Sequence, residues 1–363
     1  MRMTWPIFFF FYYIYRCCYS VFAELVVARL TPLGDTPAYH SGQIQLNLTN
    51  SNAITESLGG IFRLVVGGSP ILIDICYQTL AFVGIYKLLM AVEPVIRRRL
   101  AIFLLLPSFN LWSSVASKES VIVLLMCIIC SYIVDLYYNR GKLNILHIIS
   151  IYLLYVYKPH YMAAIVFILY VSVLAKNIKQ KAFFVILSGS ISLIPLYIYK
   201  DRINQLSMAI TEHFVGFGGS SRDAYWIDTY DIFWKAPYGM FQAFFGPTVS
   251  EAASGILHMA SFIESTIIFS LLFMFLAREL PRLPVYLFTL GVFTLFWILF
   301  TNYPLGILNP GSAIRYRTGY EILVFVVMAF LMSPNLFVTW RAGVTRGVGG
   351  APRRELVTTE SSS

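Results

Sequence analysis

Apolar stretches about as long as a membrane-spanning helix recur along this whole sequence. Apolar residues make up 58% of the 363 positions, and charged residues make up only 12%. A soluble globular domain carries about 25% charged residues, so this chain has too little polar surface to be soluble. The sequence therefore predicts an integral membrane protein.

A bilayer core about 30 Å thick requires roughly 20 apolar residues per helix. We therefore expect an all-α polytopic fold with about ten transmembrane helices, in a single domain over residues 1–340. The predicted spans lie near residues 5–25, 71–91, 100–116, 120–138, 143–158, 160–175, 182–199, 258–277, 283–301 and 319–336. The remaining stretch, residues 341–363, predicts a disordered cytoplasmic tail.

Basic residues cluster at the N-terminus, in alternate connections between the spans, and in the tail. They are Arg2, Arg97, Arg98, Arg99, Arg140, Lys142, Lys176, Lys179, Lys181, Arg278, Arg282, Arg341, Arg346, Arg353 and Arg354. An even number of spans places all of them on one side, which the positive-inside rule makes cytoplasmic. Both termini are then cytoplasmic, and the long connections 26–70 and 200–257 face outward. This pattern argues against a nucleic-acid partner despite the net charge of +9.

The first outer connection contains apolar residues at helical spacing. Ile54, Leu58, Ile61, Phe62 and Val65 repeat every three or four positions, with polar residues between them. This pattern is typical of an amphipathic helix lying at the membrane interface. We expect an outer juxtamembrane helix there.

A possible catalytic carboxylate follows the first span. Asp35 lies between Gly34 and Pro37, with Tyr39 and His40 next to them. At a membrane surface Asp35 is placed to act as a general base. The alternative is a turn-forming aspartate that hydrogen-bonds its own backbone.

Two other outer connections carry basic side chains. Residues 107–114 interrupt an apolar hairpin with a proline and several polar groups, and Lys118 and Glu119 follow. Lys158 and His160 join the fifth and sixth predicted spans. The alternatives are an ordinary hydrated hairpin turn for the first and a snorkelling lysine for the second.

Two arginines lie just before the last predicted span, where the positive-inside rule disfavours them. Arg315 and Arg317 flank Tyr316. The planar fork of arginine matches phosphate oxygens, so these residues predict a phosphate-binding site. The alternative is a structural ion pair with Glu321.

The sequence predicts no metal site. All five cysteines lie inside apolar segments, as small buried hydrophobic residues do. A divalent metal is compatible with the chain, but no ligand cluster is visible in the sequence. Intramembrane Asp74, Asp135 and Glu264 are expected to find partners inside the bundle.

Together, residues 34–39, 107–119, 158–160 and 315–317 resemble motifs of a bacterial envelope-polysaccharide membrane family. Its members are similar to GT-C glycosyltransferases, which use polyprenyl-phosphate-linked sugars. The resemblance implies an inverting glycosyltransferase or polymerase at the outer face of the bacterial inner membrane. GT-C enzymes place a catalytic acid in the first outer loop, where Asp35 is the matching position. Many members have a second acid nearby, but none follows Asp35 here before Glu56.

The resemblance also implies a substrate site and partners. The expected substrate-binding or phosphate-binding residues are Arg315, Arg317, Lys118, Glu119, Lys158, His160, Tyr39 and His40. The partners would be a polyprenyl-phosphate-linked sugar, a glycan or lipid-linked acceptor, and membrane lipids. Trp226 or Trp234 would stack on a sugar ring. The competing interpretations are a transporter or flippase of lipid-linked glycans, and a non-catalytic assembly subunit.

Overall fold

The computed structural model describes residues 4–332, apart from residues 46, 176–177, 215–221 and 223–225. Every regular element in this part of the chain is a helix. The predicted tail, residues 341–363, lies outside the described residues, as do Arg2, Lys176 and most of the glycine-rich stretch 216–222.

In chain order the elements are α1 Trp5–Phe22, a π-helical turn Ala23–Val27, α2 Ala28–Leu30, α3 Thr36–His40, α4 Ser51–Val66, α5 Pro70–Ala91, α6 Pro94–Leu104, α7 Pro107–Trp112, α8 Lys118–Tyr137, α9 Ile145–Tyr157, a 3₁₀ turn Pro159–Tyr161, α10 Met162–Leu174, α11 Lys181–Ile198, α12 Lys200–Phe214, α13 Asp231–Trp234, α14 Ala236–Phe245, α15 Val249–Ala252, α16 Ile256–Glu279, a 3₁₀ turn Leu280–Arg282, α17 Val285–Gly306 and α18 Pro310–Leu331.

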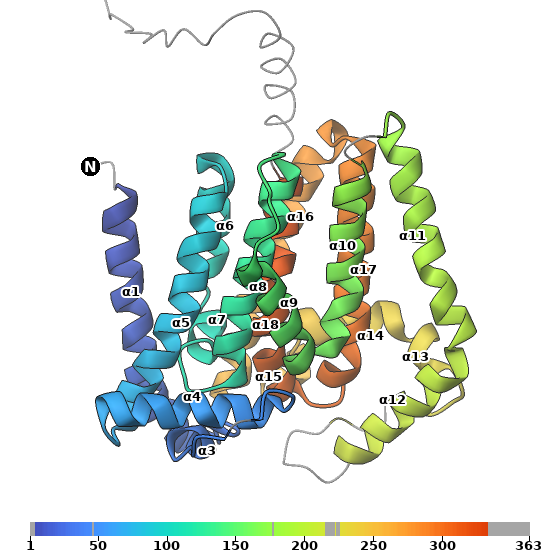
Figure 1. Ribbon diagram of the computed structural model, residues 1–363. Helices are drawn as coiled ribbons and strands as arrows, with labels where there is room; N and C mark the ends of the chain where they lie inside the picture. The colour runs from blue at the N-terminus through green and yellow to red at the C-terminus, as the bar shows by residue number, and fades with distance from the viewer. Residues whose placement is uncertain (1–3, 46, 176–177, 215–221, 223–225, 333–363) are drawn as a thin grey trace, which may run out of the picture.

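The long helices run side by side and alternate in direction (Figure 1). Four connections between the long helices lie at the end of the bundle where α1 begins, which we call the entry end. They are α5–α6, α8–α9, α10–α11 and α16–α17. Helices α3, α4 and α12 lie at the other end, which we call the α4 end. Helix α8 is mostly buried and packs against α5, α9 and α18, so it forms the centre of the bundle.

In the part of the chain that the structure describes, six helical segments are long and apolar enough to cross a membrane. They are Trp5–Leu30, Pro70–Ala91, Lys118–Tyr137, Lys181–Ile198, Ile256–Arg282 and Val285–Gly306. Two shorter apolar helices, Ile145–Tyr157 and Pro159–Leu174, lie between them. The all-α class is confirmed, and these helices indicate a membrane protein.

Large apolar side chains on the outside of the bundle support this conclusion. Phe10, Val166, Phe183, Ile191 and Phe273 are each more than half exposed. They come from α1, α10, α11 and α16, so the apolar surface surrounds much of the bundle. A soluble protein rarely exposes such a contiguous surface, whereas lipid chains cover it at no cost.

The predicted continuous span at residues 100–116 is wrong. Helix α6 ends at Leu104, and the short helix α7 begins at Pro107. Proline has no backbone N–H and disfavours a helical conformation in the residue before it. Leu106 is accordingly extended, with ψ of 133°. The chain turns here instead of continuing, and a second turn over residues 113–117 leads into α8.

Side chains of α1 and of α7 itself satisfy the polar backbone of this broken segment. Tyr12 Oη and Asn110 Nδ2 each donate a hydrogen bond to the carbonyl of Leu104, both at 2.8 Å. Arg16 Nη2 donates to the carbonyl of Ser113 at 2.7 Å. Within a membrane, irregular backbone is tolerated only where protein or water satisfies it. Helix α1 therefore holds the interrupted hairpin in place.

The helix predicted in the first connection is present as α4. The Asn50 side chain caps its first turn, accepting hydrogen bonds from two backbone amides. Ile54, Leu58 and Phe62 pack against the hydrophobic core, while Val65 is 77% exposed. Three residues of the predicted apolar stripe therefore contact the bundle, whereas Val65 near the C-terminal end of α4 lies on the outside.

The predicted long loop at residues 200–257 is also helical. Its described part contains α12, α13, α14 and α15. Arg222 pairs with Glu251, and Tyr303 donates to the carbonyl of Ile232, so side-chain contacts fix the segment to itself and to α17. Glycine, proline and aromatic residues in this segment hide its helical periodicity in the sequence.

We expect Arg16→Met to destabilise the protein. Arg16 is fully buried and donates to Gln78, Asn110 and Ser113, so its loss leaves several acceptors unsatisfied. Each unsatisfied buried group costs roughly 1–3 kcal/mol, so the expected loss is about 2 kcal/mol or more. Thermal unfolding in detergent measures this loss of stability. A thiol-reactive dye follows the transition, because unfolding exposes the buried Cys127 and Cys130. The exposed Arg29→Met is the matched control, and equal midpoints in both variants would contradict the role of Arg16.

Candidate functional site

An acidic and basic cluster at the α4 end contains most of the predicted site residues. Arg315 Nη2 lies 3.7 Å from Asp35 Oδ2, and Arg315 Nε lies 3.4 Å from Glu119 Oε1. Tyr39 Oη lies 3.4 Å from Asp35 Oδ2. Gly34 has φ of +66°, and a Cβ there would lie 1.7 Å from Arg315 Nη1. Glycine is therefore required for the close approach of this loop to the arginine.

The two predicted lysines belong to the same cluster. Lys158 Nζ lies 4.5 Å from the centre of the Tyr316 ring, and the Arg315 guanidinium lies 5.7 Å from the same ring. Lys118 is close enough to Asp35 to interact with its charge. The structure thus brings together residues from α3, α8, α18 and the α9–α10 connection. We call Asp35, Lys118, Glu119, Lys158 and Arg315 the charged cluster.

The charged cluster has a surplus of positive charge. Its three basic residues face two carboxylates, which leaves one positive charge. Arg315 and Glu119 are 16% and 2% exposed, whereas the Asp35 side chain is 57% exposed. Burial lowers the pKa of Lys158 to about 8, and the charge of Glu119 opposes that shift. At neutral pH Lys158 still carries its proton, so the cluster is suited to an anion.

The Asp35 carboxylate is not used to build the turn. Asp35 occupies the N-cap position of α3, but its carboxylate caps none of the described backbone amides. The alternative of a turn-forming aspartate that bonds its own backbone therefore finds no support in this geometry. Burial raises the pKa of Tyr39, and the negative charge of the neighbouring Asp35 carboxylate raises it further.

Arg317 lies elsewhere, inside the bundle, with 1% of its side chain exposed. Its guanidinium is 3.0 Å from Glu264 and 3.0 Å from Glu321, and it donates to Ser108 Oγ and Ser265 Oγ. The structural ion pair between Arg317 and Glu321, which the sequence analysis gave as the alternative to a phosphate-binding site, is therefore present. These contacts fix α7, α16 and α18 together, so Arg317 is a structural residue.

Of the two predicted histidines, His160 lies close enough to Lys158 to interact with its charge, whereas the ion-pair partners of His40 lie outside the charged cluster. The His160 ring packs edge-on against Tyr161, with centroids 4.9 Å apart. His40 Nε2 lies 2.8 Å from Asp74 Oδ1 and 3.9 Å from Glu24 Oε1. We call Glu24, His40 and Asp74 the acid–histidine cluster. Residue type and spacing suit it to a cation, and it is the grouping that sequence analysis missed.

The remaining predictions for single residues have mixed outcomes. Asp74 and Glu264 have partners inside the bundle, as expected, whereas Asp135 pairs with Arg140 at 3.4 Å near the surface. Trp226 is 1% exposed, so it presents no ring face to a sugar, while Trp234 is 82% exposed. The prediction of buried thiols is confirmed for Cys127 and Cys130, whereas Cys17 and Cys76 are only partly buried and Cys18 is exposed.

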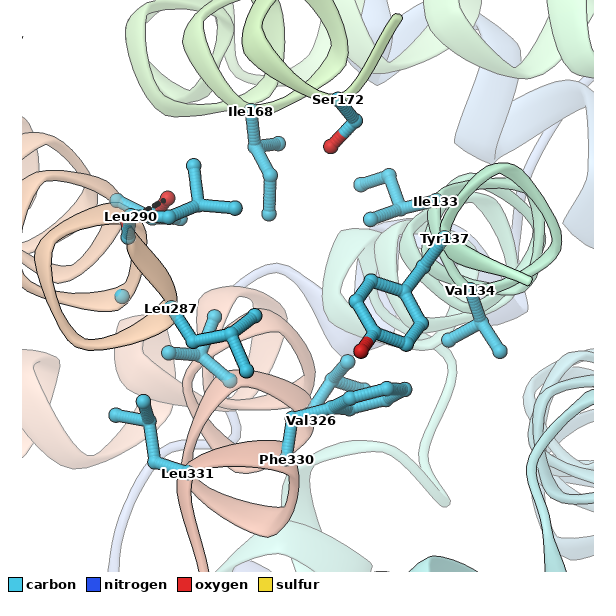
Figure 2. Close-up of a pocket in the computed structure, with 13 residues that line it drawn as sticks. Ile133, Val134, Tyr137, Ile168, Ser172, Leu287, Leu290, Val326, Phe330 and Leu331 are labelled. Atoms are coloured by element: carbon cyan, nitrogen blue, oxygen red, sulfur yellow. Dashed lines mark hydrogen bonds between the residues drawn. The ribbon is translucent and has the colours of Figure 1, made fainter. Parts of the chain in front are cut away.

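A cavity of about 60 Å³ lies between α8, α10, α17 and α18. Figure 2 shows Ile133, Ile168, Leu287 and Val326 around it. Its lining comes from the C-terminal half of α8, whereas Lys118 and Glu119 begin that helix. The cavity is almost entirely apolar, so it is a packing defect or a lipid contact and not a site for chemistry.

Comparison with known protein families, curated proteins and solved structures finds no match for this chain. The resemblance to envelope-polysaccharide glycosyltransferases therefore depends on the sequence motifs alone.

We expect Glu119→Gln to lower the pKa of Lys158 further below its usual range. The Glu119 carboxylate attracts the lysine proton, so removing its charge should shift the pKa down by roughly one unit. Arg315→Gln should shift it up, because a repelling positive charge is lost. The pH dependence of amine labelling at Lys158, followed by mass spectrometry, measures both shifts. The exposed Lys142 is the internal control, and shifts of the same sign in both variants would refute the arrangement.

Proposed function

We propose that this protein is an inverting membrane glycosyltransferase or polymerase that uses a polyprenyl-(pyro)phosphate-linked sugar. The observation that carries the proposal is the exposed Asp35 carboxylate, which contributes no cap to α3 and lies beside the partly buried Arg315. A proton acceptor and an anion-binding group next to each other are what glycosyl transfer from a lipid phosphate requires.

Each group has a distinct role in this reaction. Asp35 removes the proton from an acceptor hydroxyl while the hydroxyl oxygen forms a bond to the anomeric carbon. The bond from that carbon to the phosphate oxygen breaks, and the phosphate leaves with the electron pair. Arg315 and Lys158 stabilise the negative charge that grows on the phosphate. Glu119 orients Arg315, which it contacts at 3.4 Å.

The topology that we propose combines the positive-inside rule with the arrangement of the helices. All ten predicted spans cross the bacterial inner membrane in a GT-C-like arrangement, α6 and α7 forming one interrupted crossing. The basic connections at the entry end of the bundle are cytoplasmic, and the α4 end with the charged cluster faces outward. The alternation of helix direction supports this assignment (Figure 1). Both termini are then cytoplasmic.

We expect Asp35→Asn to reduce glycosyl transfer by roughly 10²–10⁴-fold without loss of folded protein. The amide keeps the size and shape of the side chain but accepts no proton at neutral pH. Purified protein incubated with radiolabelled polyprenyl-phosphate sugars measures product formation. Asp228→Asn, an exposed aspartate in the same outer region, should retain full activity.

Full activity in Asp35→Asn would remove the proposed base. If the purified protein forms no product but moves lipid-linked sugar between the leaflets of vesicles, the transporter alternative replaces the enzyme. Loss of activity in Asp35→Asn and Asp228→Asn alike would point to general damage of the outer segments and not to catalysis.

For the topology, we expect a cysteine at Lys142 to resist an impermeant thiol reagent in intact cells. A cysteine at the exposed Ser250 should react, because the α4 end faces outward in the proposed orientation. The background is a variant in which all five native cysteines are replaced by serine. Permeabilised cells provide the control, since both positions should then be labelled. Reversed labelling would place the charged cluster in the cytoplasm.

A further inference from the structure

We propose that Glu24, His40 and Asp74 bind one divalent first-row transition-metal ion. This inference goes beyond glycosyl transfer and does not depend on it. The three residues come from the π-helical turn after α1, from the end of α3 and from the second turn of α5. Positions far apart in the sequence thus place two carboxylates and an imidazole at one point.

The spacing of the three groups fits a shared ion. One ligand atom of each residue lies within 4.8 Å of those of the other two. Bonds of about 2.0–2.2 Å from a metal to nitrogen or oxygen place neighbouring ligand atoms roughly 3–4 Å apart. The 2.8 Å and 3.9 Å distances from His40 Nε2 to Asp74 and Glu24 bracket that range. Small side-chain movements are enough to place an ion between them.

The Asp74 carboxylate provides a second, independent observation. Its side chain is fully buried, and its Oδ1 accepts hydrogen bonds from His40 and from the backbone N–H of Ala116, the latter at 2.7 Å. Its Oδ2 accepts from no N–H or hydroxyl group among the described residues, and the Glu24 carboxyl group lies next to the Asp74 carboxylate. A buried carboxylate oxygen without a partner is costly, and a coordinated cation removes that cost.

The charge balance around the cluster also favours a cation. Glu24 and Asp74 contribute two carboxylates, and within the described chain the only recorded ion-pair partner of either is His40. One imidazole neutralises at most one of these charges. In the charged cluster, Arg315 pairs with Asp35 and Glu119, and none of these described ion pairs involves Glu24 or Asp74. An added positive ion would balance what the chain leaves uncompensated.

The local backbone of Glu24 is unusual. It lies in the π-helical segment Ala23–Val27, which interrupts the end of the first long helix. Single π turns cost stability and are frequent at functional sites, because the extra residue re-aims a side chain. Here the π turn directs the Glu24 carboxylate toward His40, whose Nε2 lies 3.9 Å from Glu24 Oε1.

The ligand types indicate which class of metal binds. An imidazole with two carboxylates suits Mn²⁺, Fe²⁺ or Zn²⁺. Mg²⁺ and Ca²⁺ prefer oxygen ligands alone. Glu24 and His40 are 19% and 13% exposed, so water has access to complete the coordination shell.

The test uses the full chain, purified in detergent without a polyhistidine tag, and Mn²⁺ as the probe. Loss of the free Mn²⁺ signal in electron paramagnetic resonance should give one bound ion per chain. His40→Ala and Asp74→Asn should each weaken binding at least tenfold. His258→Ala, which removes a histidine near the same end of the bundle, should bind as the native protein does.

A further variant keeps the test decisive if a buried substitution impairs folding. Glu24→Gln changes a partly exposed side chain, and its unfolding midpoint and elution profile show whether the protein is folded. Folded Glu24→Gln with native Mn²⁺ affinity would overturn the proposal, as would the absence of saturable binding in the native protein. Displacement of Mn²⁺ by a tenfold excess of Mg²⁺ would overturn the assigned metal class. Glycosyl transfer is not measured, so failure here leaves the proposed function untouched.

Discussion

The broken segment at residues 105–117 is the constraint on which the rest of this structure depends. Two interruptions leave backbone groups without helical partners in the middle of an apolar bundle. Arg16 and Ser20 satisfy the carbonyls of Ser113 and Ser114, and Asp74 accepts from the backbone of Ala116. Because α1 and α5 supply these partners, their polar residues are buried at positions that a simple lipid-facing helix would fill with leucine or valine.

The same segment connects three polar groupings. At its start, Ser108 contacts Glu264 and Arg317, which joins α7 to α16 and α18. At its end, Ala116 binds the aspartate of the acid–histidine cluster. Helix α8 then begins with two members of the charged cluster, and Glu119 is held against Arg315. One irregular segment, residues 105–117, therefore determines where the buried ion pairs and the candidate site lie relative to each other.

Much of the fold was predictable because apolar length and basic clusters report directly on crossing segments. The site was predictable only in part. The last span was expected from residue 319, but α18 begins at Pro310. In a helix, residues two positions apart project about 200° apart, so Arg315 and Arg317 point to opposite sides. Glu24 was overlooked because it ends an apolar stretch, and its meeting with Asp74 depends on a π turn that no local pattern indicated.

Helix α3 shows how a five-residue element can hold the proposed catalytic base in place. Tyr39 contacts Asn52 of α4, and Gly59 of α4 approaches so closely that a Cβ there would lie 1.9 Å from the Tyr39 carbonyl. On the next residue, His40 is fixed by Asp74. Contacts on both sides leave α3 little freedom to move, so this packing, together with the contacts of Asp35 with Tyr39 and Arg315, positions the carboxylate at the start of the helix. A carboxylate held in this way remains available to a substrate, as preorganised sites require.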